Sequence, residues 1–307
     1  MKILILTSGG DAPGMNKFIW EIYKKFKKET YYAQAGFAGL ISGQIYPLAD
    51  VIDKKQKNCA GVVTKSSRCP EFKLARFFNE GLANARYFDV VIILGGNGSE
   101  KGAKRLYEHG INTIFVPATI DNDVLDCAQS IGFSTAVKEG VYAVENSMPS
   151  IRAFTNSCIF EVMGRDCDAI CKAVYIIQDK VEQANENLVA KQTNADYAVC
   201  TKKDLDMQKM KDIILRNYVQ GGSSCIVIKE NLMEAKRLAD ELNQELGINM
   251  VKYQIVGRTQ RGGHPTKDEL RLAKRYAIET QKCIKTKVFG VRILIDENGE
   301  IVVKEFD

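Results

Sequence analysis

Residues 3–16 read ILILTSGGDAPGMN, an apolar run that passes directly into a glycine-rich turn, and an amphipathic stretch follows at once. A buried strand, a tight turn and a helix in this order form the first half of a crossover unit between parallel strands. Glycines let the backbone approach a ligand closely, and the free N–H groups at the start of the next helix favour an anion. The stretch predicts a phosphate-binding turn, but its spacing alone fits a purely structural turn equally well.

Short apolar runs alternate with amphipathic segments to the end of the 307-residue chain. This alternation predicts an α/β fold with mainly parallel sheets flanked by helices. Strands are expected at Ile3–Thr7, Val90–Leu94, Thr113–Val116, Cys158–Val162, Tyr197–Thr201, Cys225–Ile228 and Val251–Val256. Helices are expected at Glu100–His109, Ser134–Asn146, Leu205–Val219, Leu232–Leu246 and Lys267–Lys285. A chain of this length has room for two lobes of roughly 150 residues each.

The stretch Val288–Phe306 alternates apolar and polar residues around Asp296-Glu-Asn-Gly299. That pattern predicts a hairpin with Gly299 in its turn. We expect this hairpin to edge or cap a sheet.

The charge balance fits a small anionic ligand. With 43 basic and 38 acidic residues the formal net charge is +5, and the basic residues are scattered along the sequence. A nucleic-acid-binding surface would need a basic stripe interleaved with aromatic residues. The sequence has no such stripe, so we expect no nucleic-acid partner.

Cysteine usage and the first residues predict the compartment. Nine cysteines and two histidines show no CxxC pair and no metal-ligand spacing, which favours reduced intracellular thiols. The chain begins directly with a strand, shows no secretory signal and has no run of 18 apolar residues. The sequence therefore predicts a cytoplasmic protein without a membrane partner.

A second glycine turn and two carboxylates are expected at one edge of the sheet. Gly95-Gly-Asn-Gly-Ser99 follows one predicted strand, and Val116-Pro-Ala-Thr-Ile-Asp-Asn-Asp123 ends the next. Open α/β sheets bind ligands at the carboxyl ends of their strands. Asp121 and Asp123 could serve as general base and as metal ligand or orienting partner. Asp123 fits a helix cap or a turn residue equally well.

Seven motifs are spaced over almost the whole chain. They are SGGDAPGMN at 8–16, SSRCPEF at 66–72, GGNGS at 95–99, PATIDND at 117–123, IGFSTA at 131–136, EVMGR at 161–165 and GRTQRGG at 257–263. Together and in this order they resemble the 6-phosphofructokinase family. The resemblance implies a phosphofructokinase-like fold of two Rossmann-like lobes. It also implies a glycolytic kinase that transfers the γ-phosphoryl group of ATP to the 1-hydroxyl of fructose 6-phosphate, giving fructose 1,6-bisphosphate.

The resemblance also implies what each lobe binds. Residues 1–125 would form the nucleotide-binding lobe, rejoined by part of the C-terminal region, and residues 126–307 the sugar-phosphate-binding lobe.

Matching the motifs residue by residue gives the expected site. Asp121 would accept the proton of the sugar hydroxyl, and Thr119, Arg165 and Arg68 would complete the catalytic set. The nucleotide would be lined by Gly10, Arg68, Cys69, Gly96, Asn97, Gly98, Ser99 and Gly102. The sugar phosphate would be lined by Thr119, Ile120, Asp121, Met163, Gly164, Arg165, Glu230, Lys252, Arg258 and Arg261.

The phosphoryl donor is indicated by two small residues. Family members that use pyrophosphate resemble GGDDS and PKTIDND, in which an aspartate and a lysine fill the space of the nucleotide α-phosphate. Gly98 and Ala118 stand in these places here. The resemblance therefore implies ATP, or another nucleoside triphosphate, as the donor.

The expected metal site departs from the family pattern. The aspartate of the family's GGDGS turn, which helps to hold Mg²⁺, is Asn97 here, so a hard cation loses one charged ligand. An amide oxygen can still contribute, and Asp123 or the nucleotide phosphates can hold the ion. We expect Mg²⁺ as a cofactor, with Asn97 as a weak ligand and Asp123 as the other ligand.

The sugar side departs further from the pattern. Two arginines of the family are Asn156 and Lys252 here, a histidine is Arg258, and Lys180–Thr193 looks like an insertion. Neither Asn nor Lys reproduces the bidentate hold of a guanidinium on phosphate. In the family a neighbouring subunit completes the sugar site through these arginines, so we expect a homodimer or homotetramer.

Two other functions stay open at this point. A kinase of the same fold could act on another phosphorylated sugar or a nucleoside, because the sugar side is altered. Alternatively, the chain could be a catalytically weak paralogue that binds nucleotide or sugar phosphate as a sensor.

Overall fold

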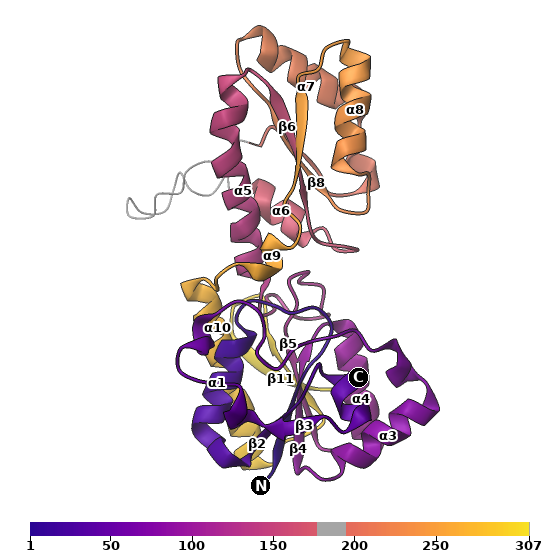
Figure 1. Cartoon of the computed structure of the whole chain (residues 1–307), viewed down its shortest axis with the longest axis vertical. Coiled ribbons are helices and arrows are strands. Elements are labelled where there is room, and N and C mark those ends of the chain that lie inside the picture. Colours follow the sequence, from indigo (N-terminus) through magenta and orange to yellow (C-terminus); the bar gives the residue numbers. More distant parts are fainter. Residues whose placement is uncertain (177–194, 307) are drawn as a thin grey trace. The chain divides into compact units, whose positions relative to one another are not determined.

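The computed structural model describes residues 1–176 and 195–306. The expected insertion at Lys180–Thr193 lies outside the described residues. The chain divides into two compact units, each with its own sheet (Figure 1). Unit 1 consists of Met1–Thr135 and Arg261–Asp307, and unit 2 consists of Ala136–Gln260.

Unit 1 is built around a seven-stranded sheet in the order β11-β10-β5-β4-β1-β2-β3. Its strands are β1 (Ile3–Thr7), β2 (Thr30–Ala33), β3 (Ile45–Pro47), β4 (Val90–Gly95), β5 (Thr113–Pro117), β10 (Val291–Ile295) and β11 (Ile301–Glu305). The edge strand β3 pairs antiparallel with β2, and the edge strand β11 pairs antiparallel with β10. The other neighbouring strands pair parallel. Every residue of β1, β4 and β5 is buried, as expected for strands with helices on both faces.

Helices cover both faces of this sheet. They are α1 (Met15–Phe26), α2 (Phe37–Ser42), α3 (Ala75–Ala85), α4 (Asn97–Glu108) and α10 (Lys267–Thr286), with 3₁₀ turns at Lys27–Glu29, Leu48–Asp50, Gln56–Asn58 and Pro70–Lys73. In Figure 1, α1 and α10 lie on one side of the strands and α3 and α4 on the other. Leu4, Leu6 and Ile93 pack with Phe78 of α3 and Leu106 of α4. The alternate strand residues point to the opposite face because side chains alternate along a strand.

Unit 2 contains a four-stranded, entirely parallel sheet in the order β7-β8-β6-β9. Its strands are β6 (Ser157–Val162), β7 (Tyr197–Val199), β8 (Cys225–Lys229) and β9 (Val251–Ile255). Its helices are α5 (Phe133–Ala153, which begins with the last residues of unit 1), α6 (Ala169–Ile176), α7 (Met207–Val219) and α8 (Ala235–Leu246), with a 3₁₀ turn at Lys202–Asp204. Ile159 and Ile226 form a core with Ile214 of α7 and Leu238 of α8. The short α9 (Thr259–Gly262) contains the passage from unit 2 back to unit 1.

The α/β prediction is confirmed, and each predicted strand and helix has a counterpart in the structure. The hairpin prediction is also confirmed, because β10 and β11 pair antiparallel at one edge of the unit 1 sheet. The predicted strand Tyr197–Thr201 ends at Val199, because Thr201 instead caps the following 3₁₀ turn through Asp204. The strands β2 and β3 were not foreseen, since each is very short.

Helix α5 was predicted to end at Asn146, ahead of Pro149, and this end is wrong. The helix continues to Ala153 with Pro149 inside it. Proline lacks the N–H that would bond to the preceding turn, and it therefore usually ends a helix. The exposed position of Pro149 lets water solvate the carbonyl that is left without that bond.

The C-terminal segment lies with the N-terminal one in unit 1. The expected division had a boundary near residue 125 and let part of the C-terminal region rejoin the first lobe, and the compact units change at 135/136 and at 260/261. The physical reason is strand pairing, because β10 adds to β5 and thereby carries residues 261–307 into unit 1. The assignment of nucleotide to one lobe and sugar phosphate to the other stays a prediction.

Candidate active site

The first glycine turn follows β1 at the carboxyl edge of the unit 1 sheet. The Ser8 N–H donates to Leu94 O at 2.9 Å, and the Gly9 N–H donates to Ser67 O at 2.9 Å. The segment that carries Arg68 and Cys69 therefore runs beside this turn. Gly9 has a φ of 92°, a left-handed conformation that glycine adopts without strain.

The second glycine turn, which follows β4, contacts the first one directly. The Ser99 hydroxyl donates to Ser8 O at 3.3 Å. A Cβ atom on Gly95 would lie 2.6 Å from the same carbonyl oxygen, so only glycine permits this approach. Helix α4 starts here at Asn97, with Gly96 as its N-cap, and the N–H groups at such a helix start can bind phosphate. Gly98 in the first turn of this helix has open space around it.

The third turn, after β5, carries the predicted base. Ala118 N–H donates to Gly95 O at 2.8 Å, which joins this turn to the second one. Asp121 is half-buried, and its N–H donates to Thr119 Oγ1 at 3.2 Å. The buried Ser130 hydroxyl donates to Thr119 O at 2.6 Å and braces the turn. The structure thus brings the three predicted turns to one edge of the sheet, as expected for strands that end together.

Arg261 lies against the first turn rather than apart from it. Its Nη1 donates to Asp11 O at 3.3 Å. A Cβ atom on Gly10 would lie 2.5 Å from Nη1, so the guanidinium rests on the glycine backbone. A cation at this place can attract a phosphate group, and the predicted contact of Arg261 with the sugar stays a prediction.

The two predicted metal ligands contact each other. Asn97 Nδ2 donates to the Asp123 carboxylate at 2.9 Å and to the Asp123 carbonyl oxygen at 3.1 Å. The described residues contain no group of three or more His, Cys, Asp or Glu side chains that could hold a metal. Mg²⁺ is commonly held by one or two carboxylates together with substrate phosphates. One carboxylate and one amide oxygen therefore fit Mg²⁺ only in company with a bound phosphate.

In unit 2 the turn Met163–Arg165 follows β6, and Glu230 holds it. One oxygen of Glu230, Oε1, accepts the N–H groups of Gly164 at 3.1 Å and of Arg165 at 2.9 Å. Arg165 has a φ of 48°, a conformation that is uncommon for a residue with a side chain. The structure therefore brings four predicted sugar-site residues together at the carboxyl edge of the unit 2 sheet.

Two further side chains hold the same turn, and the sequence did not reveal them. The buried Lys229 ammonium donates to Arg165 O at 3.0 Å. The buried Gln260 side chain accepts the Met163 N–H at 2.7 Å and donates to Ala136 O at 3.0 Å. The only sequence signal was position, since Lys229 precedes Glu230 and Gln260 lies within the GRTQRGG motif.

Lys252 does not join this group within unit 2. It pairs with Cys158 near the start of β6, and its ammonium donates to Asn249 Oδ1 at 3.2 Å. The turn at Met163 follows the other end of β6, roughly 13 Å away along the strand. Lys252 and the Met163 turn therefore lie at opposite ends of the strands of this sheet.

The remaining predicted residues differ in their surroundings. Gly102 is buried against Phe37, whose ring would lie 2.5 Å from an added Cβ atom. Arg68 and Arg258 are exposed. Cys69 is half-buried, and burial raises the pKa of its thiol. Their predicted ligand contacts stay predictions.

Asn16 and Glu269 brace the surroundings of the first turn, and neither role was foreseen. The buried Asn16 side chain donates to Gly61 O at 2.9 Å. Glu269 is fully buried and accepts the Ser134 hydroxyl at 2.8 Å and the Thr135 hydroxyl at 3.2 Å, at the start of α5. Burial raises the pKa of the Glu269 carboxyl.

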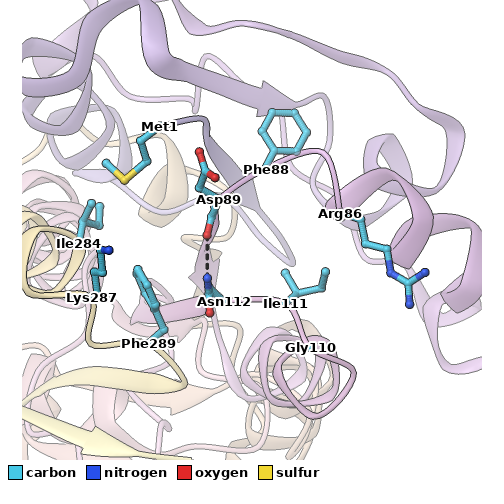
Figure 2. Close-up of a pocket in the computed structure, with 10 residues that line it drawn as sticks. All are labelled: Met1, Arg86, Phe88, Asp89, Gly110, Ile111, Asn112, Ile284, Lys287 and Phe289. Carbon is cyan, nitrogen blue, oxygen red and sulfur yellow. Dashed lines mark hydrogen bonds between the residues drawn. The ribbon is translucent and has the colours of Figure 1, made fainter.

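A hollow of about 620 Å³ lies at the amino ends of the unit 1 strands, away from these turns. Figure 2 shows its lining, which consists of Met1, Arg86, Phe88, Asp89, Gly110, Ile111, Asn112, Ile284, Lys287 and Phe289. Asn112 donates to Asp89 O at 3.0 Å across its floor. It contains none of the predicted site residues, and ligands of α/β sheets usually bind at the opposite edge.

Comparisons with solved structures agree with the observed fold. A phosphofructokinase from Saccharomyces cerevisiae superposes with a TM-score of 0.81 at 22% identity, over 99% of this chain and 44% of the yeast chain. A pyrophosphate-dependent phosphofructokinase from Nitrosospira multiformis gives a TM-score of 0.83 at 15% identity, over 99% of this chain and 82% of the other. The phosphofructokinase-like fold is therefore confirmed.

Comparisons with known sequences go further. A protein named ATP-dependent 6-phosphofructokinase from Macrococcus caseolyticus is 33% identical over 91% of this chain and 85% of its own length. One of the same name from Streptococcus sanguinis is 30% identical over 95% of this chain and 84% of its own length. The family model described as phosphofructokinase matches residues 2–284. Since that match covers nearly the whole chain, this chain belongs to the phosphofructokinase family.

Proposed function

We propose that this protein is a glycolytic kinase that transfers the γ-phosphoryl group of ATP to the 1-hydroxyl of fructose 6-phosphate, giving fructose 1,6-bisphosphate. The family and the relatives named ATP-dependent 6-phosphofructokinase support this reaction. The observation that carries the proposal is the contact of three turns at the carboxyl edge of the unit 1 sheet. The turn with Asp121 is hydrogen-bonded to the Gly95 turn, and the Gly95 turn contacts the Ser8 turn. A base beside two anion-binding turns is the arrangement that phosphoryl transfer requires.

In the proposed reaction Asp121 accepts the proton of the sugar hydroxyl as that oxygen attacks the γ-phosphorus. The Thr119 hydroxyl, which accepts the Asp121 N–H, keeps the aspartate in place. The backbone N–H groups at the start of α4 and the guanidinium of Arg261 bind phosphate oxygens. Mg²⁺ bound with the phosphates would neutralise developing negative charge, and Asp123 with Asn97 are the residues that would hold it.

We assign the sugar phosphate to the turn Met163–Arg165 of unit 2. Glu230 and Lys229 fix the backbone of this turn on both sides of Arg165. A fixed backbone orients the exposed Arg165 side chain before the substrate arrives, which reduces the entropy lost on binding. Arg165 would then contact the negatively charged substrate.

The donor is ATP rather than pyrophosphate. Gly98 has no atom within 4 Å of the place where a Cβ would stand, so the start of α4 leaves room for a nucleotide α-phosphate. Ala118, on the neighbouring turn, is small, uncharged and buried. An aspartate and a lysine at these two places would fill that room.

The protein acts as a homodimer or homotetramer in this proposal. Lys252 lies at the opposite end of the unit 2 strands from the Met163 turn. It can therefore serve a sugar site only in a neighbouring subunit. Tyr253 and Ile255, two residues apart on the edge strand β9, are exposed and share one face of that strand. Neighbouring exposed apolar groups commonly mark an interface.

We place the enzyme in the cytoplasm, the compartment of glycolysis. Among the described residues, no helix combines the length and the apolar character that a membrane crossing requires.

An assay of Asp121→Asn tests the proposed function. In the presence of Mg²⁺ we expect turnover of ATP with fructose 6-phosphate in the wild type, little turnover with pyrophosphate, and a kcat about 10²- to 10⁴-fold lower in the variant. Asp240→Asn, at an exposed position on α8, is the matched control and should keep full activity. Nucleotide binding and the circular dichroism spectrum should be the same in all three proteins.

Two results would contradict the proposal. Turnover with another phosphorylated sugar or a nucleoside, but not with fructose 6-phosphate, would assign a different acceptor. Tight binding of nucleotide with no turnover for any acceptor would indicate a sensor.

A further inference from the structure

Two of the nine cysteines lie with their sulfur atoms in contact. Cys171, on α6, and Cys200, immediately after β7, have their Sγ atoms 2.8 Å apart. Both residues belong to unit 2, and both side chains are buried, with exposed fractions of 0% and 6%. The Cys171 thiol also points at Val199 O, 3.7 Å away. The two sulfur atoms therefore meet in the interior of unit 2, where neighbouring side chains pack around both of them.

The sulfur atoms are already near the distance of a covalent bond. A disulfide has an S–S length of about 2.05 Å, so closure requires the two sulfurs to approach by roughly 0.8 Å. A shift of this size is small compared with the distance that a sulfur atom travels when a cysteine side chain rotates between staggered positions.

We propose that Cys171 and Cys200 form a reversible intramolecular disulfide when the protein meets hydrogen peroxide. In the first step the Cys200 sulfur attacks one peroxide oxygen, the O–O bond breaks, and Cys200 becomes a sulfenic acid as water leaves. In the second step the Cys171 sulfur attacks the Cys200 sulfur, the S–O bond breaks, and a second water leaves. In total two thiols lose two electrons and two hydrogen atoms, and one peroxide is reduced to two waters.

The surroundings of the pair set the order of the two steps. The hydrogen bond between the two thiols lowers the pKa of Cys200, and the positive charge of Lys172 lowers it further. Burial and the negative charges of Asp204 and Asp168 raise the same pKa, but the net shift is downward. The same hydrogen bond and burial raise the pKa of Cys171. Cys200 keeps some exposed surface, 6% against 0% for Cys171, so peroxide reaches the Cys200 sulfur first. Cys171 then resolves the sulfenic acid. The lowered pKa of Cys200 acts in the same direction, because the thiolate is the nucleophile.

A second pair of buried cysteines provides an internal control. Cys158 on β6 and Cys225 on β8 are register partners on neighbouring strands of the same sheet. The Cys158 thiol donates along its own strand to Ile159 O, at 3.8 Å. Burial raises the pKa of Cys158 to about 12 and that of Cys225 as well. Two buried cysteines without an activated sulfur should resist peroxide.

Thiol counting and peptide mapping of the full chain test the proposal. The reduced protein is treated with a graded series of hydrogen peroxide, denatured, alkylated and weighed intact, and then digested without reductant. We expect the number of alkylated cysteines to fall by two, a single new peptide that joins Cys171 to Cys200, and full reversal by dithiothreitol. Cys158→Ser should behave as the wild type, whereas Cys200→Ser should lose no pair of thiols.

A trapping experiment separates this mechanism from simple damage. In Cys171→Ser the sulfenic acid on Cys200 has no resolving thiol, so a dimedone-type reagent should label Cys200. Because a buried serine can prevent folding, Cys171→Ala and Cys200→Ala are prepared beside the serine variants and checked by circular dichroism. The wild-type peptide map decides the question even if no variant folds.

Three outcomes would overturn the proposal. They are a cross-link that joins other cysteines, oxidation of the exposed Cys59 while both Cys171 and Cys200 remain thiols, and oxidation of Cys200 to its sulfinic acid in the wild type without a cross-link.

Discussion

The turns of unit 1 and the turn of unit 2 are held in different ways. In unit 1 the Ser8, Gly95 and Thr119 turns approach one another closely at the backbone, as in the bond from Ala118 N–H to Gly95 O at 2.8 Å. The short hydroxyl side chains of Ser99 and Ser130 add bonds to backbone carbonyls there. In unit 2 the turn Met163–Arg165 is held by three side chains, those of Lys229, Glu230 and Gln260.

This difference teaches where each site is vulnerable. A backbone contact requires the absence of a side chain, so unit 1 should tolerate no added methyl group at its close approaches. A side-chain contact requires a particular donor or acceptor, so unit 2 should be sensitive to loss of polar atoms. Four experiments, from the largest expected effect to the smallest, test this comparison.

Gly95→Ala should have the largest effect. The new methyl group would stand 2.6 Å from Ser8 O and closer still to Ser99 Oγ, so the first two turns would have to separate. We expect the free energy of unfolding to fall by about 3 kcal/mol or more, as for other overpacked sites. Urea denaturation measures it, with loss of ATP binding as a second readout.

Gly98→Ala is the matched control for Gly95→Ala, because nothing lies within 4 Å of its added methyl group. It should change the unfolding free energy by less than about 1 kcal/mol. Equal losses at both positions would mean that close backbone contact does not hold the turns of unit 1.

Gln260→Leu should break the corresponding support in unit 2. The Met163 N–H and the Ala136 carbonyl oxygen would both lose their bonds to this fully buried side chain. We expect a loss of about 2 kcal/mol in urea unfolding and a raised KM for fructose 6-phosphate, with the KM for ATP unchanged. Gln244→Leu, at an exposed position on α8, should do neither. An unchanged KM for the sugar would show that the turn does not depend on Gln260.

Asn97→Asp tests whether Asn97 and Asp123 in unit 1 hold Mg²⁺. It would replace the donor that now bonds the Asp123 carboxylate at 2.9 Å with a second carboxylate. Two adjacent carboxylates bind a hard cation more strongly than one, so the Mg²⁺ concentration for half-maximal turnover should fall by about tenfold. A titration of activity with Mg²⁺ measures this, and Asn112→Asp, away from the turns, is the control. An unchanged or raised Mg²⁺ requirement would remove Asn97 and Asp123 from the metal site.

Glu269 should produce the smallest effect, as a dependence of stability on pH. Burial raises the pKa of this carboxyl above its ordinary value of 4.5, so the folded protein binds its proton more tightly than the unfolded chain does. Its contribution is therefore complete below pH 4.5 and is lost as the pH rises through the higher folded pKa.

Glu269→Gln removes this titration. From pH 4.5 to neutral pH, the unfolding free energy of the wild type should fall relative to that of the variant. Urea unfolding at a series of pH values gives this difference. A difference that stays constant with pH would show that Glu269 has the same pKa in the folded and unfolded chain.

Most strands and the longest helices could be predicted because their signal is local. The buried run Val90–Leu94 and the helix Lys267–Lys285 each show a periodicity that a few neighbouring residues encode. The glycine turns could also be predicted, because glycine is the residue that fits the close approach at Gly95 and the left-handed backbone at Gly9. The end of α5 could not be predicted. A proline such as Pro149 ordinarily stops a helix, and here its exposed surroundings let the helix continue.

The supports of the site could not be predicted, because they join residues far apart in the sequence. Met163 and Gln260 are separated by 97 positions, and no local pattern distinguishes Gln260 from a solvent-exposed glutamine.

The sequence by itself determined the α/β class, the order of the strands along the chain and the turns that carry Asp121, Gly95 and Arg165. Apolar periodicity and glycine positions encode these features through local sterics and burial. The tertiary structure alone decided which strands pair, why residues 261–307 join unit 1, and which buried side chains hold the turns. It also decided that the Cys171 and Cys200 sulfurs meet. These features depend on packing between distant segments, and the packed core fixes their distances only once the whole chain has folded.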